Sequence, residues 1–147
     1  VREFASRGGE VLGICLGMQL MLDESEEFGV HQGLGLSPGR VVRLSQKGGE
    51  GAVRVPHIGW SRIEPPNGDA RFQEPLLQGV APGSAFYFVH SYKVAPASPE
   101  RQAAITSYGP EVFCSVLRHG ALCGCQFHPE RSGPLGIRIY QNWLQQG

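Results

Sequence analysis

The sequence predicts a single α/β domain over residues 1–147, with a β-rich C-terminal half. An apolar strand, a glycine-flanked turn and an apolar helical segment follow one another at 11–22. Short strand-like segments separated by glycine-rich loops run from 40 to 127, and an amphipathic helical segment closes the chain. This length is enough for a sizeable core, and no repeat or long linker indicates a second domain.

The first nine residues are typical of the last turns of a helix, with Gly8 and Gly9 supplying its C-cap. The chain does not begin with Met. We therefore expect it to start in the middle of a fold, with earlier strands and helices of the same domain lying upstream.

The segment Gly13-Ile14-Cys15-Leu16-Gly17 places a reactive side chain between two glycines. A strand that turns sharply into a helix lifts its central residue clear of the sheet, as at a nucleophile elbow. A thiol at a helix N-terminus is expected to have a lowered pKa, which favours the thiolate. Cys15 is therefore a candidate nucleophile.

The helix after this turn is expected to bury a stripe of apolar residues formed by Leu16, Leu20 and Met21. Acidic residues crowd its far end, where they oppose the helix dipole. From the residues alone, this acidic cluster is interpreted as a solvated face. Its members are Asp23, Glu24, Glu26 and Glu27.

The remaining elements follow from alternation, β-branched and aromatic content, and turn residues. Strands are predicted at 40–44, 53–55, 60–64, 85–92, 103–107, 112–117 and 121–127, with a flexible tip at 47–51 and a short helical turn at 74–79. The final helix starts at Gly133-Pro134 and presents Leu135, Ile139 and Trp143 on one face.

A catalytic cysteine needs a base, and His128-Pro129-Glu130 offers one. Pro129 favours an extended His128, and residues two apart in an extended chain project to the same side. Glu130 is therefore expected to reach back to the imidazole. His90 is the alternative base, but within a strand it is more typical of a hydrogen-bonded core residue.

The remaining cysteines, Cys114, Cys123 and Cys125, do not have the spacing of a secreted disulfide framework, so a reducing cytoplasm is expected. Cys123, Cys125 and His128 lie close enough in sequence to suggest a metal cluster. Buried cysteines on one face of a strand are the favoured interpretation, because paired zinc ligands usually have wider spacing. No metal or cofactor is expected.

Thirteen basic and thirteen acidic residues cancel, and the isoelectric point is about 7.1. This balance gives no electrostatic reason to expect nucleic acid or an anionic membrane as a partner. No apolar run approaches the length of a membrane span, and no signal peptide is recognised.

Several motifs together resemble the class I (triad) glutamine amidotransferases, and among them the glutaminase subunits of imidazole glycerol phosphate synthases of histidine biosynthesis. The resemblance runs from about Gly9 to the C-terminus, and its specificity lies in the joint, ordered occurrence of the motifs. They are the segments 11–20, 33–42, 55–60, 86–92 and 126–130.

This resemblance implies a flavodoxin-like, doubly wound fold that here lacks its first strands. It implies a triad of Cys15, His128 and Glu130, with the Leu16 amide in the oxyanion hole. A loop in the absent upstream part would supply further oxyanion contacts. Residues implied to bind glutamine are Gly17, Gln19, Glu27, which receives the ammonium, Ser91 and Tyr92.

The implied activity is hydrolysis of glutamine through a cysteine thioester, with the ammonia passed to a (β/α)-barrel synthase subunit. Trp60, Tyr87 and Arg131 are expected to lie towards that partner, because aromatic residues and arginine are enriched in binding hot spots. Three alternatives stay open: another triad-type amidotransferase, a cysteine peptidase or γ-glutamyl hydrolase, and an inactive chain that only occupies the synthase subunit.

Overall fold

A computed structural model describes residues 1–45 and 53–146, so the tip expected at 47–51 lies outside the described residues. No helix in these two ranges is long and apolar enough to cross a membrane. The elements are, in order, α1 (Arg2–Ser6), β1 (Val11–Ile14), α2 (Leu16–Leu20), β2 (Glu24–Ser25), β3 (His31–Gln32), β4 (Gly39–Arg43), β5 (His57–Arg62), η1 (Pro75–Leu77), β6 (Ala85–His90), β7 (Tyr92–Pro96), η2 (Pro99–Arg101), β8 (Gln102–Tyr108), β9 (Glu111–His119), β10 (Leu122–Cys125), η3 (Pro129–Arg131) and α3 (Gly133–Leu144).

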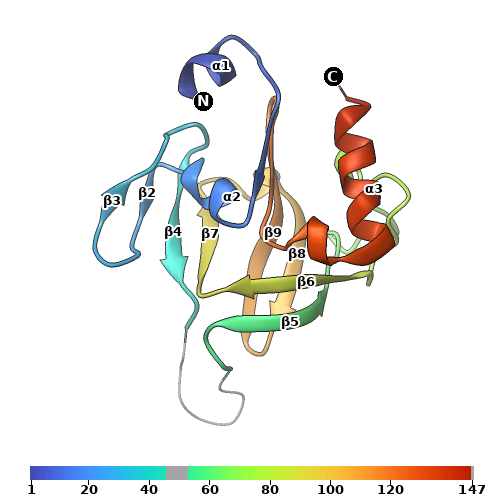
Figure 1. The fold of residues 1–147 in the computed structure, drawn as a ribbon. Coiled ribbons are helices and arrows are strands. Elements are labelled where there is room, and N and C mark those ends of the chain that lie inside the picture. The colour runs from blue at the N-terminus through green and yellow to red at the C-terminus, as the bar shows by residue number, and fades with distance from the viewer. Residues whose placement is uncertain (46–52, 147) are drawn as a thin grey trace.

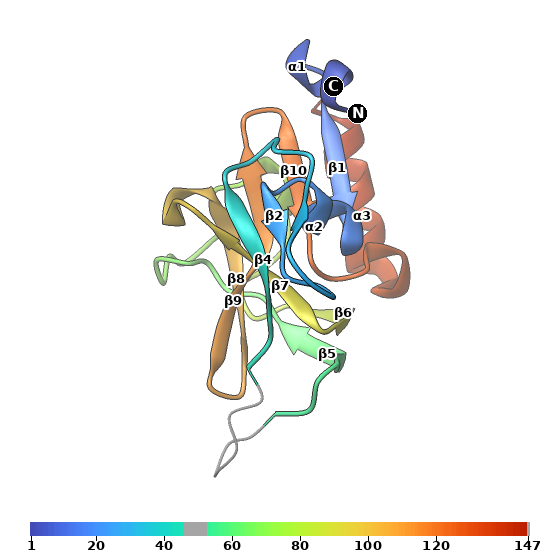
Figure 2. The same cartoon turned by 90° about the vertical axis from the view of Figure 1, so that its left-hand side faces the viewer.

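Within the described residues the strands form three sheets, ordered β1-β10-β9-β8, β3-β2-β4-β7 and β5-β6. In Figure 1 the β5–β6 ribbon runs across the β8 and β9 strands, and α3 stands to one side of them. Figure 2 shows α2 beside the β1 end of the first sheet. The chain is therefore a mixed α/β structure, as predicted, and β strands dominate after residue 39.

The pairing of β1 with β10 is the feature that positions the candidate site. These strands are parallel, with Ile14 opposite Cys125, whereas β10 pairs with β9 in the antiparallel sense. The carboxyl ends of parallel strands meet at one sheet edge. The segments that follow β1 and β10, which begin at Cys15 and Gln126, therefore lie side by side although 111 residues separate them.

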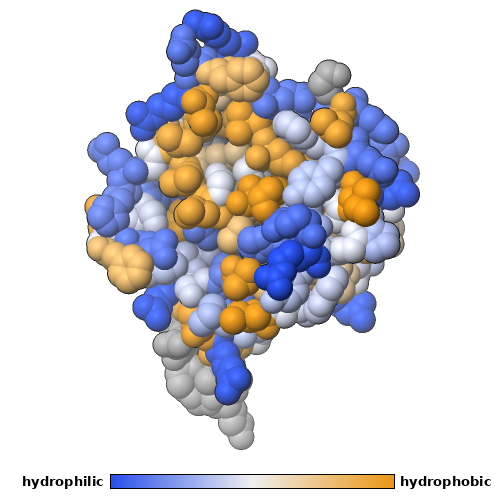
Figure 3. Space-filling model, in the orientation of Figure 1, coloured by the Kyte–Doolittle hydropathy of each residue, from blue (hydrophilic) through white to orange (hydrophobic). Residues whose placement is uncertain are grey.

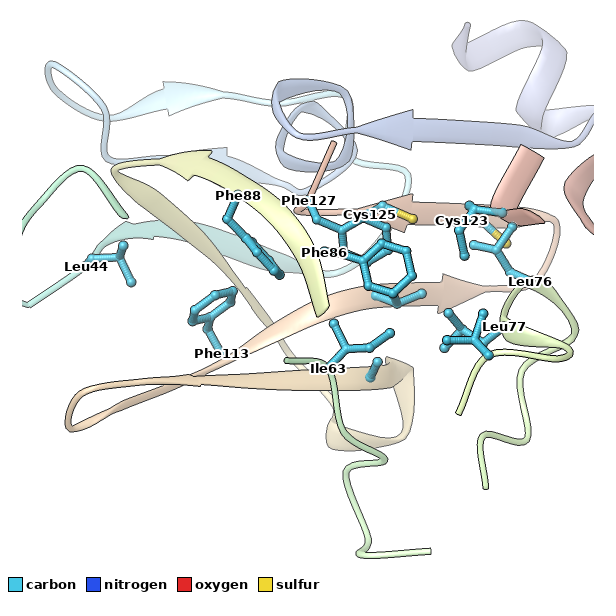
Figure 4. Close-up of a cluster of buried hydrophobic side chains, with 14 residues drawn as sticks. Leu44, Ile63, Leu76, Leu77, Phe86, Phe88, Phe113, Cys123, Cys125 and Phe127 are labelled. Carbon is cyan, nitrogen blue, oxygen red and sulfur yellow. The ribbon is translucent and has the colours of Figure 1, made fainter. Parts of the chain in front are cut away.

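The main core lies between β6, the β8–β9 hairpin and the end of β10. Figure 4 shows Phe86, Phe88 and Phe127 among its members, and all three are fully buried. The Phe86 and Phe127 rings have centroids 4.2 Å apart. Full burial of a phenylalanine side chain stabilises a fold by about 1.5–3 kcal/mol. This aromatic packing fixes β6 against the segment that carries His128.

Two strand predictions differ from the structure. The strand expected at 85–92 breaks at Ser91, where the chain leaves β5 and begins to pair with β4. The backbone N–H of Leu44 donates to the Ser91 carbonyl at 2.9 Å, which ties this break to the second sheet. The strand expected at 53–55 is not formed, because these three described residues take part in no β ladder.

The apolar stripe predicted for α2 is wrong at Leu16 and Leu20 and correct at Met21. Leu16 and Leu20 are 57% and 48% exposed, whereas Met18, Met21 and Leu22 are buried. The helix has only five residues, which is too short for a helical stripe to extend along it. Contact with β10 therefore determines which of its side chains are buried. Figure 3 shows a broad apolar area over α2 and β1, next to α1.

The two glycines that flank Cys15 give a prediction about stability. A Cβ on Gly13 would lie 2.6 Å from the Gly17 backbone carbon, whereas a Cβ on Gly17 would meet nothing within 4 Å. We expect Gly13→Ala to lower the free energy of unfolding by about 1–3 kcal/mol, as overpacking does. Gly17→Ala should be neutral or stabilising by up to about 1 kcal/mol, because alanine favours the helix.

Urea unfolding of the two variants and the parent chain measures both changes. Equal destabilisation by the two substitutions would contradict the steric role given to Gly13.

Candidate active site

Cys15 occupies a strained turn between β1 and α2. Its φ of 50° and ψ of −103° lie outside the regions that residues with a Cβ usually adopt. The Cys15 backbone N–H donates to the Cys125 carbonyl at 2.7 Å, which holds the turn against the end of β10. The half-buried thiol donates to the Val89 carbonyl, with 3.7 Å between sulfur and oxygen. The structure thus confirms the predicted elbow.

His128 and Glu130 form the predicted pair. His128 Nδ1 lies 2.6 Å from Glu130 Oε1, and the Tyr140 hydroxyl donates to Glu130 Oε2 at 3.4 Å. His128 is extended, as the following proline favours. Glu130, however, lies in η3, so the contact is made through a tight turn rather than along an extended chain. That part of the prediction is wrong, although the contact itself forms.

The backbone of His128 is anchored on both sides. Its N–H donates to the Tyr87 carbonyl at 2.8 Å, and its carbonyl accepts from the Ser132 hydroxyl at 2.7 Å. Its Nε2 atom is buried and has no hydrogen-bond partner. With Nδ1 directed to Glu130, Nε2 is the nitrogen free to exchange a proton with a reacting group.

The pKa of the Cys15 thiol is shifted in the opposite direction to the one expected. Burial raises the pKa of Cys15, and the carboxylates of Glu130 and Glu27 raise it further. The Leu16 backbone N–H and the Gln126 side-chain amide lower the pKa, but they do not outweigh burial. A lowered pKa was expected from a helix N-terminus, yet α2 has only five residues and a correspondingly weak dipole. Cys15 is therefore protonated at neutral pH.

The residues implied to bind substrate differ in their environments near the Cys15 thiol. Glu27 is half-buried and close enough to act on the Cys15 charge, and the space beyond the Gly17 Cα is open. Gln19 is 8% exposed and directs its Nε2 inward, to the Tyr92 carbonyl at 2.9 Å. Ser91 and Tyr92 follow β6 at the break described above, and both of their carbonyls accept hydrogen bonds within the protein.

The three residues expected at a partner surface lie together. Trp60 and Tyr87 are opposite each other in the β5–β6 ladder, with ring centroids 6.0 Å apart and an edge-to-face arrangement. The Arg131 guanidinium carbon lies 4.3 Å from the Tyr87 ring centroid, in a cation–π contact. Trp60 is 58% exposed. Because Arg131 shares η3 with Glu130, this cluster adjoins the candidate triad.

Four polar residues lie near the site, and three of them, His57, Ser61 and Gln126, were given no individual role from the sequence. His57, His90 and Gln126 are buried, and Ser61 is partly buried beside them. His90 was predicted to be a hydrogen-bonded core residue, and this is confirmed: its Nδ1 lies 2.8 Å from the Tyr92 carbonyl. Gln126 lies one residue past the parallel β1–β10 ladder, and its proximity to Cys15 follows from this pairing, which local sequence does not reveal.

The other cysteines are buried and unpaired. Burial raises the pKa of each thiol, and Cys123 also accepts from Arg118 Nη1 at 2.8 Å. In the described ranges, no group of three His, Cys, Asp or Glu side chains is arranged to hold a metal ion.

Comparisons with known proteins identify the relatives of this chain. The family model described as glutamine amidotransferase class-I matches residues 1–146. Imidazole glycerol phosphate synthase subunit HisH 1 of Legionella pneumophila (strain Lens) is 40% identical over 146 residues, covering 99% of this chain and 68% of the relative. Subunit HisH of Syntrophotalea carbinolica is 45% identical over 139 residues, covering 92% of this chain and 64% of the relative.

Solved structures share the fold. A protein from Thermoplasma acidophilum that carries the name of a GMP synthase subunit has a TM-score of 0.64 and 18% identity, over 98% of this chain and 60% of the other. A glutamine amidotransferase from Thermotoga maritima aligns with a TM-score of 0.58 and 18% identity, over 98% and 49%. The mixed sheets described above therefore belong to the class-I glutamine amidotransferase fold, which is flavodoxin-like.

The differing environments of the four thiols predict their order of alkylation. Cys15 is the only one of the four that is not buried, so limiting iodoacetamide should label it first in the folded protein. Peptide mapping by mass spectrometry measures the modified fraction at each cysteine. Preferential labelling of Cys114, Cys123 or Cys125 under native conditions would contradict the assignment.

Proposed function

This chain belongs to the class-I glutamine amidotransferase family, and we propose that it hydrolyses glutamine to glutamate and ammonia as the glutaminase subunit of imidazole glycerol phosphate synthase. The observation that carries the proposal is the placement of Cys15 and of the segment leading to the His128–Glu130 pair at the carboxyl ends of two neighbouring parallel strands. The 40% and 45% identities to HisH subunits support the choice among amidotransferases.

In the proposed reaction, the Cys15 sulfur attacks the side-chain amide carbon of glutamine. Because the resting thiol is protonated, His128 Nε2 first accepts its proton and then donates it to the departing ammonia. Glu130 holds the imidazole through Nδ1 and stabilises its charged form. Water then attacks the thioester carbon, breaks the carbon–sulfur bond and releases glutamate, and Cys15 regains a proton.

Charge develops on the amide oxygen during attack and needs a hydrogen-bond donor. We assign the backbone N–H of Leu16 to this role, since it already acts on the Cys15 sulfur. Loss of one such donor commonly costs about 2.7–4 kcal/mol of transition-state stabilisation.

Glutamine would enter beside the elbow. Glu27 is proposed to receive the ammonium group, and the open space beyond Gly17 accommodates the substrate chain. Ser91 and Tyr92 are proposed to contact the substrate from the opposite side. Gln19 is assigned a supporting role, because its side-chain nitrogen is already bonded inside the protein.

The ammonia is proposed to pass to a (β/α)-barrel synthase subunit over the surface formed by Trp60, Tyr87 and Arg131. Hydrolysis of glutamine belongs to this chain, and the lyase step belongs to the partner. We place the complex in the cytoplasm, where a free catalytic thiol is kept reduced. Neither a cofactor nor nucleic acid or membrane is part of the proposed reaction.

Substitutions in the triad test this function. With the synthase subunit present, Cys15→Ala should abolish glutamate and ammonia release. His128→Asn should lower kcat by about 10²- to 10⁴-fold, the usual contribution of acid–base catalysis, and Glu130→Gln should cause a smaller loss. Coupled assays of glutamate and ammonia measure these rates.

His119→Asn is the matched control, because His119 is a half-buried imidazole bonded to the Leu36 carbonyl, outside the site. It should retain the parent rate. Glutamine hydrolysis that survives Cys15→Ala would rule out the proposed mechanism.

The partner surface is tested by binding. Trp60→Ala and Arg131→Ala should each raise the Kd for the synthase subunit by about tenfold or more, the loss expected of binding hot spots. Leu144→Ala removes a side chain of similar exposure at the far end of α3 and should leave the Kd unchanged. Calorimetry measures all three, and equal Kd values would show that the partner binds elsewhere.

A further inference from the structure

A buried chain of polar groups ends at the nucleophile. Gln126 has no solvent exposure, and its Nε2 lies 3.7 Å from the Cys15 sulfur, within hydrogen-bond reach of a sulfur acceptor. On its other side, Gln126 Oε1 accepts from Gln19 Nε2 at 3.2 Å. The two amides thus form a buried pair directly beneath the thiol.

The pair is held in turn by the Tyr92 carbonyl, which two buried histidines adjoin. The Tyr92 carbonyl accepts from Gln19 Nε2 at 2.9 Å and from His90 Nδ1 at 2.8 Å. His90 Nε2 lies 3.0 Å from His57 Nδ1, and His57 Nε2 lies 2.8 Å from the Ser61 hydroxyl. The chain therefore extends from β5 to Cys15 through buried or partly buried groups.

The direction of each hydrogen bond follows from the carbonyl of Tyr92, which can only accept. His90 must donate from Nδ1, so the Nε2 of its neutral ring accepts from His57, and His57 accepts from Ser61. Burial lowers the pKa of both histidines to about 4, which keeps them neutral at physiological pH.

The same reasoning fixes the orientation of Gln126. Because Gln19 presents its NH₂ group to Gln126, the Gln126 oxygen must face Gln19 and its own NH₂ group must face the sulfur. A flipped Gln126 would set an oxygen against the sulfur and two NH₂ groups against each other, leaving buried polar atoms unsatisfied.

We propose that Gln126 is a positioning residue for the Cys15 nucleophile, oriented by Gln19, which is itself anchored on the Tyr92 carbonyl, so that the Gln126 amide stabilises the thiolate. The catalytic consequence rests on the proposed glutaminase function, but the effect on the thiol does not. The Glu27 and Glu130 carboxylates and burial all oppose a thiolate at this place, and the Leu16 N–H and Gln126 amide favour it.

The test is the pH dependence of Cys15 alkylation by iodoacetamide, followed by peptide mapping. Gln126→Met preserves side-chain size and removes the donor. We expect it to raise the apparent pKa of Cys15 by about half to one unit, which is about three- to tenfold less thiolate at a pH below that pKa. A full pH profile separates proton affinity from changes in reagent access.

Asn142→Leu is the matched control. Asn142 is a buried amide on α3 whose Nδ2 donates to the Leu76 and Gln78 carbonyls, away from Cys15. Its loss should lower stability without moving the Cys15 profile. An unchanged profile in folded Gln126→Met, or an equal shift in Asn142→Leu, would overturn the proposal.

If Gln126→Met fails to fold, Gln19→Met decides the question, because it frees the Gln126 amide without removing it. A smaller upward shift in the same direction is expected, and no shift would overturn the proposal. In glutamine hydrolysis, Gln126→Met should lower kcat about three- to tenfold with little change in KM. If the parent chain hydrolyses no glutamine, the function fails while the alkylation test still decides the role of Gln126.

Discussion

The parallel pairing of β1 with β10 is the constraint on which the site depends. It places the end of β1 beside the end of β10, so the proposed nucleophile Cys15 and the segment that carries the proposed base His128 leave the same sheet edge. The register, with Ile14 opposite Cys125, also sets Gln126 next to Cys15. A shift of one residue would exchange the faces of β10 and turn Gln126 away from the thiol.

The turn at Cys15 stores strain that its surroundings must offset. A residue with a Cβ held at a positive φ costs about 1–3 kcal/mol. The 2.7 Å hydrogen bond to the Cys125 carbonyl and the close approach of Gly13 to Gly17 hold the backbone in this turn. The thiol is therefore presented at a fixed place, and the aromatic core behind β6 keeps the His128 segment equally fixed.

Local sequence was sufficient to predict the turn at Cys15, the His128–Glu130 contact and the final helix. Each of these depends on residues that are neighbours in the sequence. Local sequence was insufficient where a strand changes partner. The residues at 85–92 have high β propensity throughout, and nothing in that propensity shows that β6 pairs with β5 while β7 pairs with β4. Gln126 was missed for the same reason, since its proximity to Cys15 exists only through long-range pairing.

The break at Ser91 also explains how the polar chain reaches the nucleophile. If β6 continued without a bend, the residue after Ser91 would stay in the β5–β6 ladder and its carbonyl would be used there. Because Tyr92 instead begins β7, its carbonyl is free to accept from both Gln19 and His90. The break at Ser91 thus places one carbonyl where it anchors Gln19, and Gln19 in turn holds the Gln126 amide beside the Cys15 sulfur.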